Sequence, residues 1–318
     1  MMHLVDLSKI KKESIRVGFG RGLVKAAEIN DAVVGVCADL TGSTKMDEFA
    51  KAFPERFFEV GVAEQNLVTV GSGLAAGGMI PFVSSYAAFS PGRNWEQIRT
   101  TICLNDQPVK IIGSHAGLSV GLDGATHQML EDLAITRVLP NMVVVAPCDS
   151  VEAEKATIAL ATNDKPSYMR LAREDTPIIT TDKTPFEIGK AYVYRPGKDI
   201  TIIATGTIVY EALLAAEILE KDDIDAEVIN CPTIKPLDAV TILQSVKKTG
   251  LVITVEEHQI AGGLGGAISE FLGEHYPVKI KRIGMKDHFG ESGEPDELLE
   301  HFGLTGKHIA IQAHQLLS

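Results

Sequence analysis

The sequence has few cysteines, and their spacing excludes the usual zinc and disulfide arrangements. Only four occur in 318 residues, Cys37, Cys103, Cys148 and Cys231, and no two of them form a C-x-x-C pair. A cysteine-based zinc site or a disulfide framework needs closer and more regular spacing, usually in a short secreted chain. We therefore expect buried free thiols in a reducing compartment.

Long apolar runs and an excess of positive charge are also missing. No apolar run approaches the ~20 residues that a membrane-spanning helix requires, and Met1 to Asp6 lacks the apolar core of a signal peptide. The formal net charge is −12, so phosphate-rich partners are repelled. These features predict a cytoplasmic protein with no nucleic-acid partner and no membrane partner.

Several well-known motifs are absent. There is no G-x-x-x-x-G-K-[ST] loop, no H-E-x-x-H motif and no G-x-S-x-G elbow. The glycine-rich stretch 262–266 follows a strand, but Ile268 stands where a dinucleotide fingerprint needs its last glycine. Close packing at a turn explains these glycines better. The scattered histidines have no ligand spacing, so we expect no metal site made by this chain alone.

What the sequence does have is an alternation of short apolar bursts and helical stretches. Bursts that are apolar along their whole length predict strands of a parallel sheet covered on both faces. In the first part they span residues 33–38, 57–60, 80–83, 109–112, 142–146 and 167–171. After a polar, turn-rich linker at 178–189, a shorter series of strands and helices starts at residue 200. The fold class is therefore α/β, with two consecutive α/β domains.

Polar side chains stand where the predicted strands of the first part end. They are Asp39, Glu64, Tyr86, His115, Asp149 and Arg173. Ligands of open α/β sheets bind beyond the carboxyl ends of the strands. Several of these residues are therefore expected to line one cleft.

Three features of this region admit a functional and a purely structural interpretation. Glu64 in "FEVGVAEQN" is either a favourable partner of a helix dipole or a buried acid that binds a cofactor nitrogen. Tyr86 and Phe89 are either helix-core aromatics or a wall that stacks on a flat ring. The glycine-rich loop 118–128 carries Asp123 and His127, a pair able to bind and protonate a hydroxylated substrate, and a loop of this length favours a function.

These motifs, in this order, resemble the last two domains of transketolase, with 1-deoxyxylulose-5-phosphate synthase as a near relative. Residues 9–173 are similar to the pyrimidine-binding domain, with "FEVGVAEQN" and "GLDGATHQMLEDLAITRVLPNMVVVAPCD". Residues 186–318 are similar to the C-terminal domain. The resemblance implies a parallel-sheet pyrimidine-binding domain at 1–180, followed by a smaller mixed-sheet domain at 187–318.

The resemblance also implies roles for individual residues. Glu64 matches the glutamate that contacts the aminopyrimidine ring of thiamine diphosphate, and Tyr86 and Phe89 match the aromatic residues that pack against this ring. Asp123 and His127 match the pair that binds the hydroxyl groups of the sugar substrates. The remaining matches are Asp39 on the cofactor side, and His115, Arg16, Ser43 and Arg173 at the phosphate end of the substrate.

One departure from the family pattern concerns the cofactor. Single-chain members carry Gly-Asp-Gly and a later Asn, which hold the metal ion and the diphosphate, and this sequence has no Gly-Asp-Gly. We therefore expect a partner chain with that motif to hold Mg²⁺ or Ca²⁺, in an α2β2 heterotetramer with the cofactors at the interfaces.

A second departure is Ala125, which stands where proline is usual in transketolases and glutamine in the synthases. It leaves the exact reaction open. A split transketolase acting on sugar phosphates is expected, with a synthase-like subunit, a 2-oxo acid dehydrogenase β-type subunit or a non-catalytic scaffold homologue as alternatives. Thr126-His127-Gln128 favours sugar chemistry over the dehydrogenases, whose matching loop usually ends in His-Ser-Gln.

Overall fold

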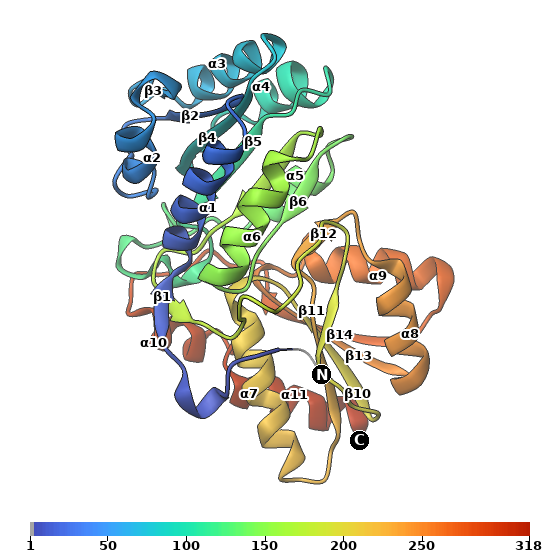
Figure 1. The fold of residues 1–318 in the computed structure, drawn as a ribbon. Helices are drawn as coiled ribbons and strands as arrows, with labels where there is room; N and C mark the ends of the chain where they lie inside the picture. Colours follow the sequence, from blue (N-terminus) through green and yellow to red (C-terminus); the bar gives the residue numbers. More distant parts are fainter. Residues whose placement is uncertain (1–2) are drawn as a thin grey trace.

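The computed structural model describes residues 3–318, which form two α/β domains lying against each other (Figure 1). Within this range, the first domain is built on a seven-stranded sheet and the second on a five-stranded sheet. A small sheet of β1 and β8 lies beside them. The predicted fold class is confirmed.

The first sheet has the strand order β12-β6-β7-β5-β4-β2-β3, and its strands are parallel except for β12. The strands of this half are β1 (Lys12–Ser14), β2 (Val33–Cys37), β3 (Phe57–Glu59), β4 (Ile80–Tyr86), β5 (Lys110–Ser114), β6 (Val143–Val145), β7 (Ser167–Arg170) and β8 (Asp175–Pro177). Its α-helices are α1 (Ile15–Ile29), α2 (Asp47–Ala52), α3 (Glu64–Ala76), α4 (Trp95–Gln97), α5 (Asp132–Arg137) and α6 (Ser150–Ala161).

Both faces of this sheet are covered, which explains why most residues of its strands are apolar. Phe82 and Ile112 belong to the core under α1 and α6, whereas their neighbours Val83 and Ile111 belong to the core under α3. Successive side chains of a strand point to opposite faces, so a sheet between two helical layers needs apolar residues at every position.

The second domain has a mixed sheet of order β14-β13-β10-β11-β9, in which β9 is antiparallel to its neighbour. The strands of this half are β9 (Tyr192–Arg195), β10 (Ile200–Ala204), β11 (Ala226–Asn230), β12 (Thr233–Lys235), β13 (Leu251–Gln259) and β14 (Lys279–Met285). The helices are α7 (Val209–Glu220), α8 (Ala239–Thr249), α9 (Leu264–His275), α10 (Pro295–His301) and α11 (Gly306–Leu317).

Two segments cross between the halves of the chain. Strand β12 leaves the second half and pairs with β6 at the edge of the first sheet. In the other direction, Leu4, Leu7 and Ile10 precede β1 and pack against the core of the second domain. The predicted domain limits, 1–180 and 187–318, divide the chain by sequence position, and neither crossing segment follows that division. These limits stay a prediction.

Candidate active site at the end of the first sheet

The strand ends of the first sheet bring several of the predicted residues to one edge. Tyr86 is the last residue of β4, and His115 directly follows β5 with φ +55°. Asp39 follows β2 with φ +60° and is exposed. A positive φ is uncommon for a residue with a side chain, and such strained positions concentrate at functional sites.

Glu64 begins α3 and is almost completely buried, with 5% of its surface exposed. Its carboxylate Oε2 accepts a hydrogen bond from Arg93 Nη1 at 3.1 Å. The backbone carbonyl of Glu64 accepts a second one from the buried amide of Asn94 at 2.8 Å. An open hollow lined by residues 62–66 and Arg93 lies at this helix start. The carboxylate is thus held in place at the border of solvent.

An aromatic wall stands beside this acid. Tyr86 and Phe89 stack with ring centroids 5.9 Å apart, and Tyr86 stacks on His115 at 3.8 Å. His127 approaches the ring of Phe89 edge-on at 5.4 Å. The structure therefore joins residues of two predicted groups, the aromatic pair and the loop histidine, in one cluster.

Burial, together with positive charge near this wall, keeps His115 neutral. Burial and then the charges of Arg16, Arg173 and His127 lower the pKa of His115 to about 3. The side chain of Ser114 lies 2.8 Å from His115 Nδ1. At neutral pH the imidazole of His115 is consequently uncharged, so it can offer a hydrogen bond but no charge to a ligand.

The loop with Asp123 and His127 is the short 3₁₀ segment Leu118–Asp123 and the turn after it. Gly117, Gly121 and Gly124 all have positive φ, which lets the backbone fold back on itself. Arg173 Nη1 lies 3.4 Å from Asp123 and donates to the carbonyl of Val120 at 2.8 Å. Asp123 therefore faces a cation.

The side chain of Arg16 links Ser43 and Arg173, because it contacts the backbone of both residues. The guanidinium of Arg16 donates to the carbonyls of Ser43, at 2.6 Å, and of Arg173. Burial lowers the pKa of Arg16. Both guanidinium groups are engaged: Arg16 also donates to the Ser14 hydroxyl at 3.0 Å, and Arg173 is paired with Asp123 and Glu174, each at 3.4 Å.

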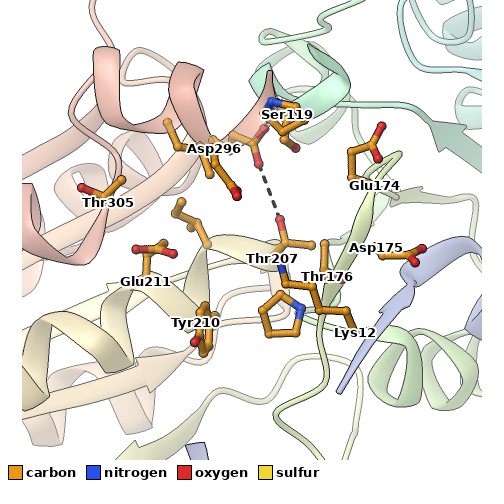
Figure 2. A pocket seen from close by; sticks show the side chains of 15 residues that line it. Lys12, Ser119, Glu174, Asp175, Thr176, Thr207, Tyr210, Glu211, Asp296 and Thr305 are labelled. Atoms are coloured by element: carbon orange, nitrogen blue, oxygen red, sulfur yellow. Dashed lines mark hydrogen bonds between the residues drawn. The ribbon is translucent and has the colours of Figure 1, made fainter. Parts of the chain in front are cut away.

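A cavity of about 290 Å³ opens behind the loop, at the boundary between the domains (Figure 2). Ser119 of the loop and Thr207 of the second domain line it, together with the acids Glu174, Glu211 and Glu257. Glu257 of β13 is buried, its pKa is raised by burial, and it accepts a hydrogen bond from the backbone N–H of Ser119. The aromatic wall does not line this cavity, and Glu257 is the cavity acid that holds the loop from behind.

Arg93, Glu59 and Glu257 were not among the predicted site residues. Glu59 lies in the "FEVGVAEQN" motif and accepts from the backbone N–H of Asp39 at 2.6 Å and from the Thr41 hydroxyl at 2.9 Å, so the motif itself was the available signal. Arg93 and Glu257 reach the site only through the fold, and neither was singled out as a site residue from the sequence.

The described residues offer no preformed metal site and no membrane span. Within residues 3–318, no group of three or more His, Cys, Asp or Glu side chains is arranged to hold a metal ion. None of the helices in the same range is both long and apolar enough to cross a membrane. The four cysteines are buried and free.

Comparison with known protein families assigns both halves of the chain. The model for "Transketolase, pyrimidine binding domain" matches residues 11–178, and the model for "Transketolase, C-terminal domain" matches residues 189–309.

Similar proteins cover nearly the whole chain. A "Putative transketolase C-terminal section" of Methanocaldococcus jannaschii is 46% identical, over 96% of this chain and 97% of that protein. A 6-deoxy-6-sulfo-D-fructose transketolase subunit of Clostridium sp. (strain MSTE9) is 41% identical, over 97% and 96%. A solved structure described as "Split gene transketolase, inactive beta4 tetramer" is 43% identical with a TM-score of 0.90, over 96% of this chain and 98% of that one.

Proposed function

Since the chain belongs to the transketolase family, we propose that it is the C-terminal subunit of a split, thiamine diphosphate-dependent transketolase. The proposed reaction moves a two-carbon ketol unit from one sugar phosphate to another. The observation that carries this proposal is the convergence of Glu64, the Tyr86–Phe89 wall and His127 at one edge of the sheet. These are the parts that hold a flat cofactor ring and face a hydroxylated substrate.

The residues fit the pyrimidine half of the cofactor. Thiamine diphosphate, when bound, supplies the nucleophilic carbon and the electron sink that ketol transfer requires. Glu64 is a buried carboxylate beside an open hollow, suited to exchange a proton with a ring nitrogen. Tyr86 and Phe89 provide an apolar wall for the ring, and Asp39 lies on the same side of the sheet.

The substrate side is formed by the loop and the cations behind it. Asp123 and His127 bind sugar hydroxyl groups and position a proton donor beside them. Arg173 is the cation for the phosphate end, and the neutral His115 adds an uncharged hydrogen bond there. Arg16 and Ser43 belong to the same phosphate end, where the Arg16 guanidinium donates to the backbone carbonyls of Ser43 and Arg173.

A partner chain with a Gly-Asp-Gly…Asn motif completes the site by holding the diphosphate and Mg²⁺ or Ca²⁺. Two observations support it: the chain has no Gly-Asp-Gly, and a similar split-gene protein is described as an inactive β4 tetramer. We propose an α2β2 heterotetramer in the cytoplasm, with domains at 1–180 and 187–318.

Calorimetry tests this proposal. Thiamine diphosphate with Mg²⁺ is titrated into this chain alone and into its mixture with a candidate partner carrying Gly-Asp-Gly…Asn. Binding in the mixture only, together with ketol transfer from a ketose phosphate, is expected. Tight binding by this chain alone contradicts the proposal that this chain lacks a diphosphate site. No binding in either case favours the alternative that the chain is a non-catalytic scaffold homologue.

Glu64→Gln tests the role of the acid itself. The amide keeps the shape of the side chain but removes its proton exchange, so activity should fall by roughly 10²- to 10⁴-fold while partner binding is unchanged. Glu55→Gln, an exposed glutamate of the same region, is the matched control and should be fully active. Unchanged ketol transfer in the Glu64 variant sinks the assigned role.

A further inference from the structure

The guanidinium of Arg93 contacts both Glu64 and Phe89, the two residues proposed to bind the pyrimidine ring. Its Nη1 donates to Glu64 Oε2 at 3.1 Å, and its central carbon Cζ lies over the ring of Phe89, 4.2 Å from the ring centre. Glu64 is buried, whereas the side chain of Arg93 is 53% exposed. One planar, N–H-bearing group thus contacts both the acid and the aromatic wall.

An aminopyrimidine ring makes the same pair of contacts. It is flat, carries an amino group and ring nitrogens along its edge, and stacks on an aromatic neighbour through its face. A guanidinium is also flat, with N–H groups along its edge and a face that stacks on aromatic rings. The two groups cannot contact the same carboxylate and the same ring face together.

We propose that Arg93 occupies the position of the cofactor's pyrimidine ring in the isolated chain and has to move aside before the ring can bind. Arg93 thereby becomes a residue that sets cofactor affinity, and it keeps the buried acid paired while the site is incomplete. This inference deepens the proposed function and rests on it for the identity of the ring.

The surrounding contacts allow the side chain to move without the backbone. Asn94, the next residue, is fully buried, and its amide donates to the carbonyl of Glu64 at 2.8 Å and to the hydroxyl of Ser90 at 3.1 Å. The segment is therefore anchored at Asn94. The half-exposed guanidinium of Arg93 is held by one ion pair and one contact over an aromatic ring, so a rotation of its own side chain releases both.

The test uses the full chain and the pyrimidine half of thiamine alone, 4-amino-5-hydroxymethyl-2-methylpyrimidine, which needs no diphosphate site. Trp95, the only tryptophan in the chain, is two residues from Arg93, so its fluorescence reports occupation of the site without any activity assay. Arg93→Gln should bind this probe roughly three- to tenfold more tightly than the wild type, because the competing contacts are gone.

Two further variants make the result specific. Arg99→Gln removes the same charge from an exposed position on the same segment and should leave the affinity unchanged. Adding Glu64→Gln to Arg93→Gln should abolish the gain, because the acid is the bonding partner of the ring. Equal or weaker binding by Arg93→Gln, no binding to either chain, or an equal gain in Arg99→Gln overturns the proposal.

Failure of this inference can be told apart from failure of the proposed function. If the mixture with the partner catalyses ketol transfer but Arg93→Gln gains no affinity, only the inference is wrong. If Arg93→Gln gains affinity for the probe but no mixture binds thiamine diphosphate, the pyrimidine site exists and the transketolase assignment is wrong.

Discussion

Glu152 is a fully buried acid at the contact of the two domains, and its titration lies near neutral pH. It accepts hydrogen bonds from the backbone N–H of Cys148 at 2.7 Å and from the amide of Asn230 at 2.8 Å. Burial, and then the charge of Asp149, raise the pKa of Glu152 to about 7, against 4.5 ordinarily. The folded protein therefore favours the neutral acid, so its stability falls as the pH rises from about 4.5 to 7.

Glu152→Gln should remove this pH dependence. The free energy of unfolding of the variant, minus that of the wild type, should increase by a few kcal/mol between pH 4.5 and 8. Any destabilisation by the amide that does not depend on pH shifts this difference equally at every pH. Urea unfolding at several pH values measures the difference. Glu217→Gln, at an exposed position of α7, is the control. If the difference in unfolding free energy is the same at every pH in this range, Glu152 is not the source of the pH dependence.

Individual residues also show how much of the site could be predicted from the sequence. Glu64, Tyr86 and His115 were predicted together because the carboxyl ends of parallel strands meet at one edge. Arg93 was missed because its partner Glu64 is 29 residues away in the chain, with no motif joining them. Asp149 was placed in the cleft by its position after a strand, but it caps α6 and accepts from the backbone of Ile179 and Thr180.

At the scale of elements, the loop that carries Asp123 and His127 is held by the second domain. The backbone N–H of Ser119 donates to Glu257, and the Thr207 hydroxyl lies 3.5 Å from the other carboxylate oxygen, the contact drawn in Figure 2. The side chain of Gln128 donates to the carbonyl of Glu291 at 2.8 Å. Strand β13 therefore sets the orientation of a loop that belongs to the other domain.

Glu257→Gln should loosen this loop without emptying the cofactor site. The amide offers one acceptor oxygen in place of two, so kcat/KM for sugar substrates should fall by about 10- to 100-fold, as expected for misplaced substrate-binding groups. Affinity for thiamine diphosphate in the assembled enzyme should stay unchanged. Glu211→Gln, which lines the same cavity but contacts Gly306 of α11, is the matched control. A loss of cofactor affinity instead, or an equal loss in both variants, contradicts this role.

At the scale of the whole molecule, strand order follows from the sequence for the central strands but not for the edge. The bursts from residue 33 to 171 are largely apolar, apart from residues such as Glu59, Lys110 and Arg170, and became the parallel strands β2 to β7. The short β12 lies in the second half, yet Ile234 on it is buried in the core of the first domain. A three-residue strand has no pattern that names its partner, so only packing decides which sheet it joins.

This crossing strand should make the two domains unfold together. Trp95 reports the first domain alone, whereas far-ultraviolet circular dichroism reports both, so the wild type should give coincident thermal transitions by the two probes. Ile234→Asp places a charge in the first core and should cost about 2–4 kcal/mol there. The Trp95 transition should then move to lower temperature and separate from the second one. Val240→Asp, at a 65% exposed position of the same half, should leave the transitions coincident. Two separate transitions already in the wild type would show that β12 does not couple the domains.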